Sequence, residues 1–174
     1  RRGEAMALRW QDVDLDGRTL TVAKALQRLD GQFQLVERKA THAHRKINLS
    51  QIVASALGRH RARQSQGRLL ADPEWVDDFG LVFVTRRGTP IDASNLVRAW
   101  HKLLEWAGLP RCRFHDLRHT AASLLLSQHV DPRVVMEILG HSQISLTMNT
   151  YAHVIPALQR EAADSMDEVL RRAV

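Results

Sequence analysis

The sequence predicts an α+β fold that is mainly α-helical, in which a compact helical body carries a small antiparallel β-sheet on one edge. Two observations lead to this prediction. Apolar residues recur at helical spacing between capping residues over most of the chain, while short alternating segments around turns occupy the first fifty positions. With 174 residues, 44% of them hydrophobic, the chain can bury a core as one domain.

The N-terminal part of the chain is expected to supply the sheet. A first helix is predicted over residues 3–10, with Ala5 and Leu8 facing inward. Four short segments then alternate as strands, at residues 12–14, 19–22, 34–37 and 46–49. Asp16-Gly17 signals a turn between the first two strands, and the last two are expected to pair through a basic hairpin. The alternative for this hairpin is a solvated turn whose cations protect an edge strand.

The middle of the chain predicts two helices separated by less regular backbone. Ser50 is the expected cap of a helix over residues 51–63, followed by a loop at 67–78 and a short extended segment at 81–84. Asp92 or Ser94 should cap a second helix that ends at Gly108. Its expected core face is formed by Leu96, Trp100, Leu103 and Leu104.

The most informative stretch runs from Phe114 to His153 and is interpreted as three short helices. The first has an apolar stripe of Leu117, Ala121 and Leu124, so His115 and Arg118, at i and i+3, should project together away from it. The second begins at Asp131-Pro132, presents Val134, Val135, Ile138 and Leu139, and stops at Gly140. His141 follows directly. The third carries Ile144, Met148 and Tyr151.

These residue types suit chemistry on a phosphodiester. An arginine binds phosphate through a bidentate fork, a histidine can move a proton, and a tyrosine hydroxyl can act as a nucleophile. For any one of these residues the alternative is an ordinary surface or half-buried position. Their joint order within about forty residues is what calls for a functional explanation, because a helical hairpin can bring such positions together.

Composition restricts the possible partners and cofactors. The net charge of +6 and the pI near 10.4 point towards a polyanion such as nucleic acid. The single cysteine, Cys112, excludes an internal disulfide and a cysteine-based zinc site. The nine histidines show no metal-binding spacing, so no metal and no cofactor are predicted. No apolar run has membrane-spanning length, and no signal peptide is visible.

The ordered motifs resemble the catalytic domain of the tyrosine recombinases, the phage-integrase family. They are an Arg-x-Gly-Glu helix start, a lysine on a β-hairpin, a His-x-x-Arg box, a Leu-Gly-His turn and a tyrosine. In this sequence the matching residues are Arg1 with Glu4, Lys39, His115 with Arg118, His141 and Tyr151. Arg1 is preferred to Arg2 by its offset from Glu4, and Lys46 is an alternative to Lys39.

The resemblance implies an integrase-like catalytic core over residues 1–174, truncated at its N-terminus and lacking a core-binding domain, with residues 156–174 as an amphipathic tail helix. It further implies that Tyr151 cleaves and rejoins DNA through a 3′-phosphotyrosyl intermediate without metal or ATP. Arg1 and Arg118 would bind the phosphate, assisted by His141. His115 would accept a proton, Lys39 would protonate the leaving oxygen, and Glu4 would support the site.

The implied partner is double-stranded DNA, with a homotetramer assembled through the tail, possible accessory DNA-bending or directionality proteins, and no membrane. The implied location is the bacterial cytoplasm and nucleoid, for a bacterial or phage-encoded protein. Three alternatives remain. One is a basic DNA-binding module without catalytic activity, the second is a type IB topoisomerase-like strand transferase, and the third is a metal-dependent nuclease that uses the scattered histidines.

Overall fold

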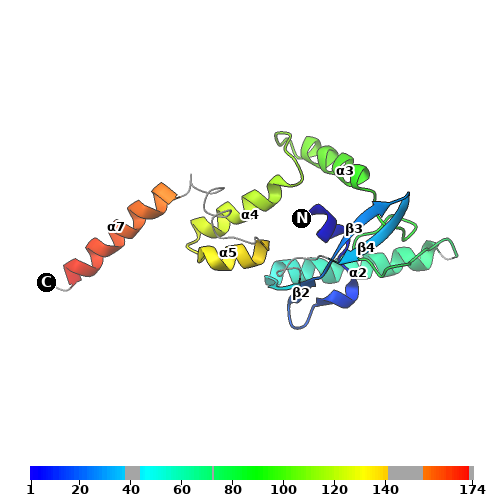
Figure 1. The fold of residues 1–174 in the computed structure, drawn as a ribbon, viewed down its shortest axis with the longest axis horizontal. Helices are drawn as coiled ribbons and strands as arrows, with labels where there is room; N and C mark the ends of the chain where they lie inside the picture. Colours follow the sequence, from blue (N-terminus) through cyan, green and yellow to red (C-terminus); the bar gives the residue numbers. More distant parts are fainter. Residues whose placement is uncertain (38–43, 72, 141–154, 173–174) are drawn as a thin grey trace. The chain divides into compact units, whose positions relative to one another are not determined.

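The structure is a computed structural model that describes residues 1–37, 44–71, 73–140 and 155–172. These residues divide into two units, Arg1–His115 and Asp116–Val174, and each is described by itself (Figure 1). All described strands lie in the first unit, while the described elements of the second are helices. The predicted class, mainly helical with a small antiparallel sheet, is confirmed.

Helix α1 (Arg2–Met6) opens the first unit and is shorter than the predicted helix over residues 3–10. The helix ends early because the next residues bond to another segment. Val82 N–H donates to the carbonyl of Leu8 at 2.8 Å, and Trp10 N–H donates to the carbonyl of Gly80 at 2.9 Å. A 3₁₀ turn, η1 (Trp10–Asp12), follows. The buried side chains of Met6 and Ala7 form a core cluster with Leu26.

The strands form two antiparallel sheets with a different pairing from the predicted one. β1 (Val13–Asp14), β2 (Thr19–Val22) and β5 (Arg45–Asn48) make one sheet, while β3 (Lys24–Leu29) and β4 (Gln32–Glu37) make a hairpin. The prediction that residues 34–37 pair with 46–49 is therefore wrong. The reason is local: Asp30 and Gly31, both with positive φ, form a two-residue turn that pairs β4 with β3 before the chain reaches β5.

Helix α2 (Gln51–Ala71) begins where predicted and extends further. Ser50 caps it, with its Oγ accepting from Val53 N–H at 3.4 Å. The helix continues beyond residue 63, so the first part of the loop predicted at 67–78 is helical. Along this extension Gln64 donates to the carbonyl of Leu81 at 3.0 Å, and His60 Nε2 lies 2.7 Å from the carbonyl of Val82. These bonds attach α2 to segment 81–84, which forms isolated β-bridges at Leu81 and Val84; Leu81 and Val82 are buried, whereas Phe83 is exposed.

Helix α3 (Ala93–Trp106) confirms the second predicted helix of this region. Asp92 caps it, because its Oδ1 accepts from Ser94 N–H at 2.8 Å, and the chain turns at Gly108 with φ of 65°. Leu104 is buried as predicted, whereas Leu103, predicted for the same face, is 51% exposed.

The second unit is built on a helical hairpin of α4 (Asp116–Ser127) and α5 (Pro132–Leu139), which lie side by side (Figure 1). The caps of α5 are confirmed: Asp131 Oδ1 accepts from Arg133 N–H at 2.7 Å, and Gly140 is left-handed. The apolar stripe predicted for α4 is wrong, since Leu117 and Leu124 are 45% and 60% exposed. The hairpin core consists instead of Ala122, Leu126, Val135 and Leu139.

Helix α7 (Ile155–Arg172) confirms the predicted C-terminal helix. Three apolar residues of its predicted stripe, Met166, Val169 and Leu170, are exposed. No described helix has both the length and the apolar character needed to cross a membrane. The predicted helix with Ile144, Met148 and Tyr151 lies outside the described residues.

Candidate active site

The predicted site residues fall into three groups. Arg1, Glu4 and His115 belong to the first unit, and Arg118 belongs to the second. The other three predicted residues, Lys39, His141 and Tyr151, lie outside the described residues.

Arg1 and Glu4 are brought together by α1 itself. Arg1 is the N-cap of the helix, and Glu4 stands three residues on, so the two side chains share one face. The Nη1 atom of Arg1 donates to Glu4 Oε1 at 2.9 Å. Between them, Gly3 faces β3, where a Cβ would make ordinary van der Waals contact, 3.4 Å from the carbonyl oxygen of Leu26. The ion pair accounts for Arg1 and Glu4 of the Arg-x-Gly-Glu motif, while the surroundings of Gly3 do not require glycine.

A second arginine completes this group on the other oxygen of the same carboxylate. Arg45, the first residue of β5, places Nη2 2.6 Å from Glu4 Oε2. The Glu4 side chain is only 4% exposed, and those of Arg45 and Arg1 are 11% and 35% exposed. Arg45 is not among the site residues predicted from the sequence. The alternation of β5 contained the signal, since Arg45 and Ile47 share the more buried face while Lys46 and Asn48 are exposed.

The electrostatics of this cluster hold Glu4 in its ionised form. Burial alone would raise the pKa of Glu4, but the hydrogen bonds from Arg45 and Arg1 outweigh it. The pKa falls from 4.5 to about 2. A cavity of about 280 Å³ adjoins the cluster, and its other lining residues are mostly apolar, including Leu20, Val22 and Phe83. In such surroundings charge–charge interactions are strengthened.

His115 is positioned by the segment that leads out of α3. Trp100 of α3 donates from Nε1 to the carbonyl of Cys112 at 3.0 Å, and its ring meets that of Phe114 edge to face at 5.8 Å. His115 comes next and is exposed. It helps to line a cavity of about 490 Å³ whose other basic members are Arg2, His101 and Arg113. Arg1 and Arg2 therefore line different cavities, Arg1 beside Glu4 and Arg2 beside His115.

Arg118 lies in the first turn of α4 and is half-buried. His115 precedes this helix, which corrects the prediction that the two residues project together from one helix. Arg118 is spaced i, i+4 and i, i+8 from Ala122 and Leu126, so it is on the side of α4 that faces the core of the second unit. The Arg118 side chain therefore extends from α4 next to the face that carries Ala122 and Leu126.

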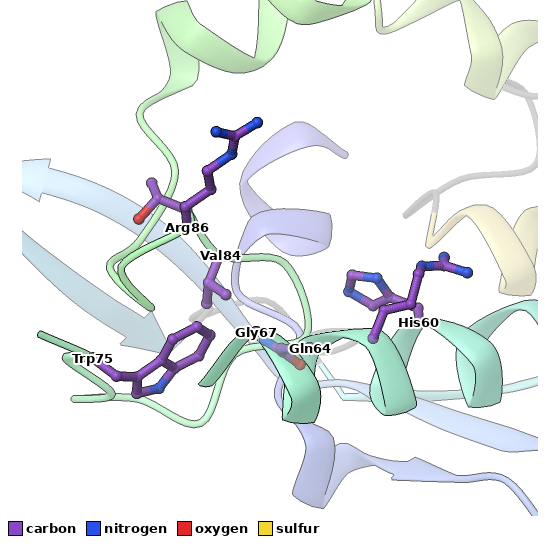
Figure 2. Close-up of a pocket in the computed structure, with 8 residues that line it drawn as sticks. His60, Gln64, Gly67, Trp75, Val84 and Arg86 are labelled. Atoms are coloured by element: carbon purple, nitrogen blue, oxygen red, sulfur yellow. The ribbon is translucent and has the colours of Figure 1, made fainter. Parts of the chain in front are cut away.

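Another cavity of the first unit contains none of the predicted site residues. It has a volume of about 760 Å³, and Figure 2 shows His60, Gln64 and Gly67 of α2 on one side and Trp75, Val84 and Arg86 on the facing segments. Gly88 is needed beside it, because it has φ of 80° and a Cβ there would lie 2.5 Å from the carbonyl of Val76. This packing joins α2 to residues 75–88. Within the described part of the chain, no three His, Cys, Asp or Glu residues are grouped as metal ligands.

Comparison with known proteins places this arrangement in context. The family model described as "Phage integrase family" matches residues 1–157. A tyrosine recombinase XerC-like protein of Caldanaerobacter subterraneus subsp. tengcongensis is 33% identical, over 97% of this chain and 46% of its own length. The ICEBs1 integrase of Bacillus subtilis is 28% identical, over 98% and 46%. The chain thus spans about half the length of these relatives.

Solved structures of an integrase and a recombinase also match this chain. The Tn1549 transposon integrase, in a complex with transposon right end DNA, matches with a TM-score of 0.76 and 26% identity, over 94% of this chain and 55% of that one. The XerA recombinase matches with a TM-score of 0.71 and 22% identity, over 93% of this chain and 53% of that one. At this identity the match shows a similar fold.

Proposed function

Because the chain belongs to the phage integrase family, we propose that it forms the catalytic domain of a site-specific DNA recombinase that cleaves and rejoins double-stranded DNA. The observation that carries the proposal is the family match over residues 1–157, which includes all six predicted catalytic positions. The buried carboxylate that fixes Arg1 gives one of those positions a defined geometry. The names of the relatives favour recombination over topoisomerase activity or simple DNA binding.

In the proposed reaction, the hydroxyl oxygen of Tyr151 attacks the scissile phosphorus. A bond from phosphorus to the tyrosine oxygen forms, and the bond from phosphorus to the 5′-oxygen breaks. The electron pair leaves on the 5′-oxygen, which takes a proton from Lys39, while His115 accepts the tyrosine proton. The products are a 3′-phosphotyrosine and a free 5′-hydroxyl. Attack by a new 5′-hydroxyl reverses the step, so rejoining needs no nucleotide cofactor.

Charge stabilisation is the proposed task of the guanidinium groups. Arg1 and Arg118 would bind the non-bridging oxygens, with His141 as a further donor, so that the phosphate charge is neutralised in the transition state. Glu4 fits a supporting role, because it is buried, ionised and bonded to Arg1. A carboxylate kept ionised by two arginines is a poor proton donor near neutral pH. Its contribution is therefore orientation.

We also propose that residues 156–174 act in assembly. The described part of α7 exposes Met166, Val169 and Leu170, and three exposed apolar side chains on one helix are suited to docking on a protein surface. The proposed arrangement is a homotetramer on DNA in which each tail packs on the next protomer. Deleting residues 157–174 from the full-length protein should leave DNA binding by single protomers intact and abolish the tetramer. Sedimentation of the DNA complexes measures this outcome.

The reaction is tested with Tyr151→Phe in the full-length enzyme on a nicked suicide substrate that carries its own core site. Wild type should accumulate a denaturant-resistant protein–DNA adduct through the 3′-phosphate, with chelator present. Tyr151 is the only tyrosine in the chain, and phenylalanine removes only its hydroxyl. The variant should keep its circular dichroism spectrum and its DNA affinity but form no adduct. An adduct that persists in Tyr151→Phe, or that requires a divalent metal, would contradict the mechanism.

A further inference from the structure

We propose that Arg45 is a positioning residue for strand cleavage: it holds Glu4, and through Glu4 it sets the direction of the Arg1 guanidinium. This inference rests on the proposed function and deepens it, because it adds a residue to the machinery that binds the scissile phosphate. It arises from a carboxylate, that of Glu4, which two arginines from separate parts of the first unit share.

The geometry assigns one guanidinium to each oxygen of Glu4. Arg45 Nη2 lies 2.6 Å from Oε2, and Arg1 Nη1 lies 2.9 Å from Oε1. With both oxygens engaged, the plane of the carboxylate is fixed. Without Arg45, the carboxylate would rotate towards the remaining cation, since a buried charge without its partner is costly. Arg1 would then move with it.

The two arginines differ in burial, and this difference separates their tasks. The Arg45 side chain is 11% exposed, so it is enclosed by the protein and poorly placed to reach DNA. The Arg1 side chain is 35% exposed and retains surface towards solvent. Arg45 is therefore suited to act through Glu4, while Arg1 is suited to contact a ligand.

The two arginines also differ in how their backbones are supported. Arg45 begins β5 and is paired with Val22 of β2 in a three-stranded sheet, and Val22 is buried. Arg1 is the N-cap of α1, which lies outside the sheets. The bonds through Glu4 connect Arg1 to the paired strand β5, beside a mostly apolar cavity in which ionic interactions are strengthened.

The consequence for cleavage follows from the task proposed for Arg1. A guanidinium stabilises the transition state only if it meets the non-bridging oxygens at the right distance, and a displacement of about 1 Å can reduce the rate about 100-fold. Losing Arg45 should therefore impair neutralisation of the phosphate charge. It should leave protonation of the 5′-oxygen unaffected.

The experiment compares Arg45→Ala with wild type in the full-length enzyme, as the single-turnover rate of adduct formation at saturating DNA. Three suicide substrates are used. One has the natural phosphodiester, one has an uncharged methylphosphonate at the scissile position, and one has sulfur in place of the 5′-bridging oxygen. The methylphosphonate removes the charge that Arg1 would neutralise. The thiolate leaving group departs without a proton.

Arg45→Ala should cleave the phosphodiester about 100-fold more slowly than wild type. On the methylphosphonate the two enzymes should differ only a few-fold. This substrate has no negative charge at the scissile position, so the rate no longer depends on where the Arg1 guanidinium lies. On the sulfur substrate the large difference should remain. Arg45→Lys keeps the charge but loses the planar fork, so it should show the same pattern with a smaller loss, and it serves as the test if Arg45→Ala does not fold.

Arg9→Ala is the matched control, because Arg9 forms an equally close ion pair with Asp12, at 2.8 Å and 3.1 Å, within the same unit. Its rate per folded molecule should equal that of wild type on all three substrates. Equal losses for Arg45→Ala on all three substrates, or recovery on the sulfur substrate, would overturn the inference. A wild-type enzyme that forms no adduct with the phosphodiester would overturn the proposed function and the inference together.

Discussion

The two units hold their predicted phosphate-binding arginines by different means. In the first unit, Arg1 is directed by an ion pair to a buried carboxylate, which a second arginine from the sheet holds in place. In the second unit, Arg118 stands on a helix whose position is set by apolar packing of Ala122 and Leu126 against α5. An ion pair orients a side chain, whereas apolar packing positions a helix backbone. Substitutions of ion-pair partners should therefore matter most for Arg1, and substitutions of packed apolar residues should matter most for the stability of the second unit.

The largest effect is expected at the arginine of the second unit. Arg118→Ala should reduce adduct formation about 10³-fold, since an arginine on a transferring phosphate contributes on that scale. The matched control is Arg133→Ala, which removes an exposed cation of the same unit. That variant should lose at most a few-fold, measured as single-turnover rates at saturating DNA. Similar losses in both variants would show that the net charge of the unit matters and that Arg118 has no special place.

A second pair of substitutions tests which face of α4 is packed. Leu126 is 5% exposed, so Leu126→Ala should cost about 2–5 kcal/mol in the free energy of unfolding. Leu124 is 60% exposed, and Leu124→Ala should change the same quantity by about 0.5 kcal/mol or less. Urea unfolding followed by circular dichroism gives both values. The reverse order of effects would restore the stripe first predicted from the sequence.

Acid should weaken the first unit through Glu4. The folded-state pKa of about 2 lies below the ordinary 4.5, so the stabilising contribution is complete above pH 4.5 and is lost as the pH falls towards 2. The loss should not exceed about 3 kcal/mol. Glu4→Gln cannot titrate, so the decline of its unfolding free energy over this range should be smaller by that amount. Parallel curves for wild type and Glu4→Gln would contradict the assigned pKa.

The smallest effects compare one helix cap from each unit. Asp131→Ala removes an acceptor 2.7 Å from the N–H of Arg133 and should cost about 1 kcal/mol of unfolding free energy. Ser50→Ala removes a longer bond, 3.4 Å to Val53 N–H, and should cost less. Thermal unfolding of both variants measures the difference. A larger loss for Ser50→Ala would indicate that α2 depends on its first turn more than on its attachment to residues 81–82.

Several features of this protein could be predicted from the sequence because local chemistry determines them. The strand at residues 19–22, the caps Ser50, Asp92 and Asp131, and the stop at Gly140 were all predicted and confirmed. In each case the determining groups lie within a few residues of one another. The pairing of Arg1 with Glu4 is local in the same sense, since the two residues lie within one turn of helix.

Tertiary structure alone decided the features that depend on distant partners. Helix α4 has apolar side chains at positions 117, 121, 122, 124, 125 and 126, which spread over about half of the helix circumference. Periodicity therefore could not select which part of this wide face is buried, and packing against α5 selected Ala122 and Leu126. The pairing of β5 also depended on tertiary structure, because β4 pairs locally with β3 through a tight turn, whereas β5 pairs with the more distant β2. Arg45 acquired its role in the same way: the strand alternation marks it as inward, but only the fold brings it to Glu4, 41 residues away in the chain.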